Sequence, residues 1–152
     1  IETLFVNRQK VIKYLRGQPY LDPQAASTNK ADQQFLEDVQ HLVNDQLGDV
    51  GFNVEAMSQK LGMSKRNLQL KLKALIGKTP IELIREARMM KAVELLRKER
   101  GTIAEIAYQV GFADPAYFHR VFKQQYKLTP KQFMNHAKAF PVDGESVPRQ
   151  EK

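Results

Sequence analysis

The sequence contains two related stretches, VEAMSQKLGM at residues 54–63 and IAEIAYQVGF at residues 103–112, which lie forty-nine positions apart. In both, apolar residues recur at helical spacing, and a glycine stands at the same place, as Gly62 and as Gly111. Glycine at the end of a helical pattern favours the left-handed conformation of a C-terminal cap, so each stretch predicts a short helix that ends in a turn. A repeat of this kind indicates two copies of one structural unit.

A second helix is expected after each turn. Ser64 is a suitable N-cap in the first copy and Asp114 in the second, where Pro115 takes the first helical position and its missing N–H costs no hydrogen bond. Each of these helices has one apolar face, formed by Leu68, Leu72 and Leu75 in the first copy and by Phe118, Phe122 and Tyr126 in the second. Two helices joined by a short turn form a helix–turn–helix, whose second helix enters the major groove of DNA.

The repeats predict an all-α fold with two helix–turn–helix units joined by a long linker helix. We expect the first unit at about residues 53–79, the linker helix at 80–99 and the second unit at about 102–134. The linker helix opens at Pro80, and its expected apolar face consists of Ile81, Ile84, Ala87, Met90, Ala92, Val93, Leu95 and Leu96. A continuous helix between the units would set their separation.

Upstream of the repeats, the pattern predicts an N-terminal amphipathic helix at residues 3–16, a proline-containing linker at 18–30, and another amphipathic helix that begins at Asp32. The chain is therefore expected to have three regions. They are residues 1–30, a helix and linker from an upstream domain; residues 31–136, the double helix–turn–helix domain; and residues 137–152, a disordered tail.

Composition limits the class of protein. The 152 residues contain no cysteine, which excludes disulfides and cysteine–metal sites, and no apolar run long enough to cross a bilayer. The net charge of +7 is uneven, because residues 53–136 hold sixteen Lys/Arg and seven Asp/Glu, whereas the remainder has a balance of −2. A basic excess confined to the repeats indicates an anionic partner such as nucleic acid. No nucleophile–base set or paired carboxylates stand out, so no enzyme activity, metal or cofactor is expected.

Residues 53–134 resemble the DNA-binding domain of the AraC/XylS family of bacterial transcription regulators. The resemblance is strongest in IAYQVGFADPAYFHRVFK at residues 106–123, which is followed by Thr129 and Pro130. It implies two helix–turn–helix units that bind adjacent major-groove segments of one promoter site.

The upstream part of the chain also resembles known proteins. Residues 5–9 and 31–36, on either side of the linker, are similar to the segment that joins a receiver domain to such an output domain. This implies the output part of a hybrid two-component sensor or a response regulator. The expected partners are double-stranded promoter DNA and RNA polymerase, with dimerisation through the upstream part. A cytoplasmic location without membrane contact by this part is expected, and a parent protein anchored in the inner membrane is compatible with it.

The candidate DNA contacts lie opposite the apolar faces of the two recognition helices. Arginine can pair with guanine, asparagine or glutamine with adenine, and leucine can contact a thymine methyl. Base contacts are expected from Arg66, Asn67, Gln69, Leu70, Ala116 and Arg120, of which Arg66 and Gln69 match family base contacts. Phosphate contacts, which position a protein without reading sequence, are expected from Lys65, Lys71, Lys73, Tyr117, His119 and Lys123. Tyr117 could equally be a packing residue, and the polar positions could be ordinary exposed ones.

Two positions depart from the family pattern. The family usually has arginine where this chain has Leu70, and glycine where it has Lys127. The leucine favours an alternative function, a helical protein-interaction module that retains the fold without specific DNA binding. The basic excess and the intact second recognition helix favour DNA.

Overall fold

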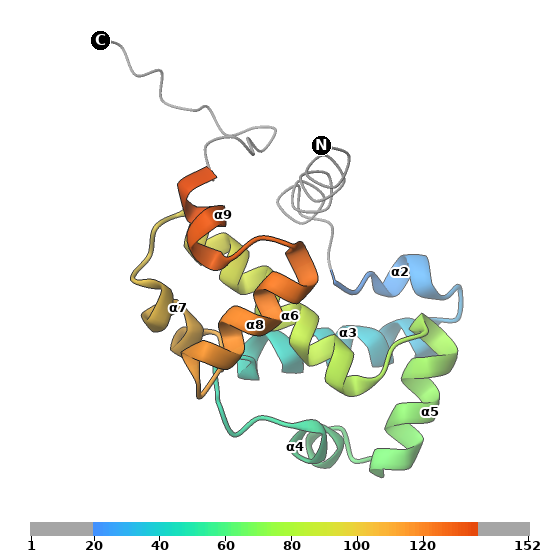
Figure 1. Ribbon diagram of the computed structural model, residues 1–152. Helices are drawn as coiled ribbons and strands as arrows, with labels where there is room; N and C mark the ends of the chain where they lie inside the picture. Colours follow the sequence, from blue (N-terminus) through green and yellow to red (C-terminus); the bar gives the residue numbers. More distant parts are fainter. Residues whose placement is uncertain (1–19, 137–152) are drawn as a thin grey trace.

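The computed structural model describes residues 20–136, which contain helices and no strand (Figure 1). The helices, in chain order, are α2 (Pro23–Ala26), α3 (Lys30–Gln46), α4 (Val54–Lys60), α5 (Lys65–Ile76), α6 (Pro80–Arg97), α7 (Ile103–Gln109), α8 (Pro115–Tyr126) and α9 (Pro130–His136). The all-α prediction is confirmed, with α4 and α5 as the first helix–turn–helix, α7 and α8 as the second, and α6 between them. The helix predicted at residues 3–16 and the tail predicted at 137–152 lie outside the described residues.

The helix boundaries of both units follow local signals. Ser64 and Asp114 cap α5 and α8 by accepting backbone N–H bonds at 3.1 and 3.0 Å, and Pro115 is the first residue of α8. Gly62 and Gly111 follow α4 and α7 in left-handed conformations, with φ of +68° and +94°. Each N-cap satisfies a donor that the helix start leaves unpaired, which contributes about 1 kcal/mol.

The linker helix α6 belongs to two hydrophobic cores. Its first half packs with α3, α4 and α5, and its second half packs with α7, α8 and α9. The predicted apolar face is wrong at three positions of α6. Ile81 is 57 % exposed, whereas Leu83 and Met89, which the pattern omits, are fully buried. A helix that meets different partners along its length buries different sides in turn, so no single stripe describes it.

Residues 20–26 pack on the first unit, which differs from the predicted linker. Leu21 is 2 % exposed and belongs to the core around α3. The Tyr20 hydroxyl donates to Asn44 Oδ1 at 2.8 Å, and Lys78 Nζ donates to the Tyr20 carbonyl at 3.2 Å. Burial raises the pKa of Tyr20. The segment lacks helical periodicity because contacts with α3 and with the turn before α6 hold it, and these require no repeating apolar face.

The loop after α3, which leads into the first unit, touches the turn after α7 in the second unit. A Cβ built on Gly111 would lie 2.1 Å from the carbonyl oxygen of Leu47, and one built on Gly48 would lie 2.9 Å from the carbonyl oxygen of Gln109. Neither glycine can carry a side chain unless the loop and the turn move apart.

Arg88 of α6 holds the same loop by hydrogen bonds. Its guanidinium donates to the carbonyl of Leu47 at 2.9 Å and to the carbonyls of Asp49 and Phe52 at 3.1 Å. Burial lowers the pKa of Arg88, an effect that the nearby charge of Asp49 opposes, and the guanidinium stays protonated. The linker helix therefore fixes the orientation of the units as well as their separation.

Candidate nucleic-acid interface

The exposed faces of α5 and α8 form the candidate interface. Leu68 and Leu72 of α5 are fully buried, as are Phe118 and Phe122 of α8, so each helix turns its opposite face to solvent. The exposed positions include Lys65, Arg66, Asn67, Gln69, Leu70, Lys73, Ala116, Tyr117, His119, Arg120 and Lys123. Of the residues expected to contact DNA, only Lys71 is not exposed.

Lys71 lies on a different side of α5 from the other candidates. It comes three positions after the buried Leu68, which brings it near the apolar face. Its Nζ is 4.3 Å from the centre of the Phe35 ring of α3, and its side chain is half-buried. A cation over an aromatic ring gains about 0.5–1 kcal/mol at such sites. The expected phosphate contact of Lys71 does not fit this position, because the ammonium packs against α3.

Tyr117 packs and is exposed at the same time. Its ring centre lies 5.8 Å from that of Phe112, and the guanidinium carbon of Arg120 lies 5.7 Å from the Tyr117 ring centre. The residue remains 42 % exposed. Tyr117 therefore packs against the second unit and still has an exposed side that can contact DNA. Its ring also restricts the positions that the Arg120 side chain can take.

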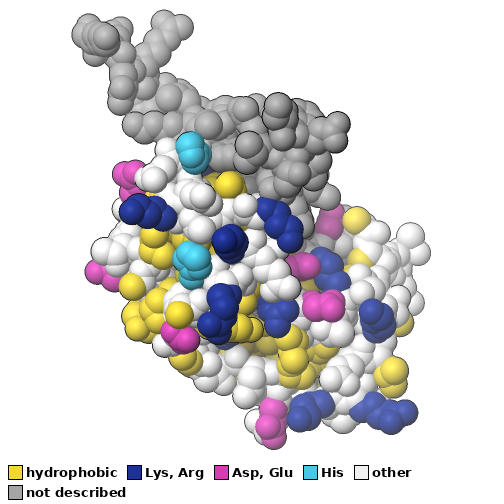
Figure 2. Space-filling view, viewed as in Figure 1, with side chains coloured by type: hydrophobic (Ala, Val, Ile, Leu, Met, Phe, Trp, Pro, Cys, Tyr) yellow, Lys and Arg dark blue, Asp and Glu magenta, His cyan; other side chains and the backbone are white. Residues whose placement is uncertain are grey.

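Within the described part of the chain, no ion pair joins a cation of this surface to a carboxylate. The ion pairs described within residues 20–136 join Lys78 to Glu86 and Glu94 to both Lys91 and Lys98, and none of them involves α5 or α8. Figure 2 shows Lys and Arg side chains over α8 and around the end of α5 that follows α4. A polyanion that binds here therefore meets none of the described ion pairs on either recognition helix.

Arg85 and Arg88 of α6 are candidates that the sequence pattern does not reveal. Both interrupt the apolar pattern where the helix passes from one core to the other. The interruption of the apolar pattern is the one sign of these residues in the sequence. Their roles depend on contacts with the loop after α3 and with the two recognition helices, which are distant in sequence.

Among residues 20–136, no group of three or more His, Cys, Asp or Glu side chains could hold a metal ion. No helix in the described range is long and apolar enough to span a bilayer.

The tandem helix–turn–helix and its basic surface define a DNA-binding domain of transcription regulators. A family model described as a helix-turn-helix domain matches residues 57–136. The chain belongs to this family, in its AraC-type branch. The chain resembles a DNA-binding regulator domain, and its match to a histidine kinase covers only a small part of that protein.

Two curated relatives and one solved structure illustrate the family. The C-terminal domain of the two-component response regulator YesN from Fusobacterium nucleatum is 35 % identical, with a TM-score of 0.62 over 64 % of this chain and 95 % of that chain. Histidine kinase P4 from Formosa agariphila is 33 % identical over 135 residues, 89 % of this chain and 10 % of the kinase. The transcriptional activator RhaS from Escherichia coli O139:H28 is 33 % identical over 79 residues, 52 % of this chain and 28 % of the activator. The chain thus spans only a minor part of the curated relatives it matches.

Proposed function

We propose that this domain binds one promoter site at two adjacent major-groove segments, with α5 in the first segment and α8 in the second. The observation that carries the proposal is the exposure of both recognition helices on units that α6 and Arg88 hold together. The 18 residues of α6 give a length of roughly 27 Å, which is of the same order as the 34–36 Å that separates successive major-groove faces. One chain can therefore cover both segments without a palindromic site.

Each exposed side chain is assigned a role by its chemistry. Arg120 is assigned to guanine, and Leu70, which is 58 % exposed, to a thymine methyl. Base contacts are assigned to Arg66, Asn67, Gln69, Leu70, Ala116 and Arg120, and phosphate contacts to Lys65, Lys73, Tyr117, His119 and Lys123.

In the longer protein, we assign this domain the role of the output of a two-component system. The similarity to a histidine kinase and to a response regulator supports that assignment. Bound at a promoter, the domain would present its other surfaces to RNA polymerase, and dimerisation would come from the upstream part. Bacterial promoter DNA lies in the cytoplasm, so the proposal places this domain there.

A protein-interaction module is the second candidate, and one observation favours it. Leu70 is an exposed apolar side chain in the middle of α5, where a protein partner could bury it. Burial of that leucine would contribute about 1.5–3 kcal/mol in either kind of complex. The cations around it favour DNA, because a protein partner would need a matching acidic surface.

The test begins with a pool of random duplexes, from which the full chain should enrich a site with two contacted segments. Fluorescence titration should show the enriched duplex bound at least about 10³-fold more tightly than a scrambled one. Insertion of about five base pairs, half a turn, between the segments should rotate one of them away and abolish two-segment binding. DNA bending could compensate only at a cost of about 1–6 kcal/mol. Failure to enrich any duplex would favour the protein-interaction module, and a footprint that survives the insertion would rule out the rigid two-segment mechanism.

A further inference from the structure

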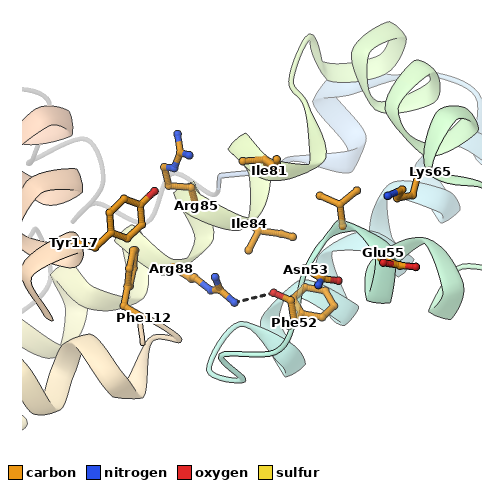
Figure 3. A pocket seen from close by; sticks show the side chains of 11 residues that line it. Phe52, Asn53, Glu55, Lys65, Ile81, Ile84, Arg85, Arg88, Phe112 and Tyr117 are labelled. Carbon is orange, nitrogen blue, oxygen red and sulfur yellow. Dashed lines mark hydrogen bonds between the residues drawn. The ribbon is translucent and has the colours of Figure 1, made fainter. Parts of the chain in front are cut away.

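A groove of about 390 Å³ lies between the two units and is lined by residues of both (Figure 3). Phe112 and Tyr117 stand at one end, Glu55 and Lys65 at the other, and Ile81 and Arg85 of α6 lie between them. The groove belongs neither to the first recognition surface nor to the second, because it spans the gap from one to the other.

The ends of the groove coincide with the starts of the two recognition helices. Lys65 is the first residue of α5, and Tyr117 is the third residue of α8. Residues at the start of a recognition helix are those that approach base edges. A duplex that engages both helices must therefore pass over the groove, with the strand between its two major-groove segments above α6.

Two arginines of α6 line this groove and have different surroundings. The guanidinium of Arg88 is turned into the junction, where it donates to three backbone carbonyls. Arg85 is exposed and points in another direction in Figure 3. Within residues 20–136, the guanidinium of Arg85 takes part in none of the described ion pairs or hydrogen bonds. The charge of Arg85 is thus available to a ligand.

The chemistry of the lining indicates an anionic ligand with an apolar component. Among the described lining residues, Glu55 is the single acid, and Lys65, Arg85 and Arg88 are cationic. Ile81 is 57 % exposed on the wall formed by α6. Cations beside an exposed aliphatic surface match a sugar–phosphate strand, whose phosphates alternate with apolar faces of deoxyribose. Guanidinium binds phosphate through two parallel hydrogen bonds.

We infer that Arg85 binds the DNA backbone between the two major-groove segments and so makes α6 a third contact surface. The inference rests on the proposed two-segment binding. It adds a contact that requires both segments to be occupied, since neither unit alone brings a strand across the groove. Arg85 would also anchor the duplex against lateral movement over Ile81.

The experiment compares Arg85→Gln with Lys91→Gln in the full chain. Both substitutions remove one cation from α6, but Lys91 pairs with Glu94 and lines a separate hollow on the α3 side. With the enriched two-segment duplex, Arg85→Gln should weaken binding on the order of tenfold at low salt. It should also lower the slope of log K against log salt by about one. Lys91→Gln should leave the slope unchanged.

Two altered duplexes locate the contact. On a duplex that holds only one segment, Arg85→Gln should bind as the unsubstituted chain does. In the second duplex, neutral methylphosphonate linkages replace the phosphates between the two segments. This replacement should weaken binding by the unsubstituted chain, whereas the affinity of Arg85→Gln should be the same for both forms of the duplex. Thermal melting of the free variant, followed by circular dichroism, should match that of the unsubstituted chain.

The outcomes separate this inference from the proposed function. An unchanged salt slope for Arg85→Gln, or an equal loss on the one-segment duplex, would overturn the role of Arg85 and leave two-segment binding intact. If the unsubstituted chain does not prefer the two-segment duplex to a scrambled one, the proposed function fails and the role of Arg85 fails with it.

Discussion

The first helix–turn–helix unit packs aliphatic side chains where the second packs aromatic rings. Leu68 and Leu72 of α5 correspond to Phe118 and Phe122 of α8, and all four are fully buried. In the second unit the Phe122 ring lies 4.7 Å from Tyr126 and 6.0 Å from Phe133, centre to centre. Each such pair contributes about 0.5–1.5 kcal/mol beyond the area it buries. The same backbone is thus held by two different kinds of core, of which the aromatic one has the more directional contacts.

The exposed faces of the two recognition helices differ in another way. With the offset of fifty residues that relates α5 to α8, Leu70 corresponds to Arg120, and Lys73 corresponds to Lys123. Positions assigned to bases therefore differ between the units, whereas the lysine assigned to phosphate is shared. A duplicated scaffold can keep its means of positioning DNA while its two halves recognise different sequences, so the expected site is asymmetric.

The largest difference between the units is expected at their turn glycines. Gly62 and Gly111 are equivalent, but a Cβ on Gly62 would meet nothing within 4 Å, whereas one on Gly111 would lie 2.1 Å from the Leu47 carbonyl oxygen. Gly62→Ala should cost about 0.5–1 kcal/mol, which is the strain of a left-handed alanine less the entropy that glycine loses on folding. Gly111→Ala should cost that amount plus about 1–3 kcal/mol of overpacking at the junction. Urea unfolding of both variants measures the difference, and equal losses would mean that the two units do not press against each other at this point.

The next effect concerns the base-reading positions. Arg66→Ala and Arg120→Ala should each cost about 1–3 kcal/mol on the enriched site and relax specificity under their own helix. Lys73→Ala, as the control, should weaken all sequences similarly and lower the salt slope by about one. Leu70→Arg should move the preference under α5 from thymine to guanine. Competition titrations with single-base variants measure each effect. A loss for Arg66→Ala that is equal on enriched and random duplexes would remove Arg66 from the base readers.

Features that depend on short stretches of chain could be predicted from the sequence. The caps at Ser64 and Asp114 and the buried faces of α5 and α8 each depend on about a dozen consecutive residues, so periodicity and cap chemistry suffice. The surface opposite those faces follows from the same helical geometry. For this reason every candidate DNA contact except Lys71 is exposed in the structure, as the helical projection predicts.

Features that depend on contacts between distant segments could not be predicted in this way. Leu21 is buried by helices that follow it in the chain, and Lys71 is engaged by Phe35, thirty-six positions earlier. Arg88 donates to the carbonyl of Leu47 in the loop after α3, forty-one positions earlier. Helical projection also failed for Ile81, because the partners of α6 change along its length. The groove beside Arg85 exists only once these contacts bring the units together.

The smallest effect is expected at the C-caps of the recognition helices, where Gly77 and Lys127 adopt left-handed conformations with φ of +69° and +61°. A side chain in this conformation costs about 1–2 kcal/mol, and the greater freedom of glycine in the unfolded chain offsets about 0.5–1 kcal/mol of that. Lys127→Gly should therefore stabilise the second unit by about 0.5–1 kcal/mol. Lys127→Ala is the matched control, since it removes the same charge and keeps the Cβ, and it should give no such gain.

Gly77→Ala should lower stability by a similar amount, because a Cβ there is strained but meets no neighbour. Urea midpoints of the three variants measure these differences. If glycine and alanine at position 127 gave equal stability, the backbone there would carry no strain, and the two caps would differ only in the charge that Lys127 adds beside Lys123 and Arg120.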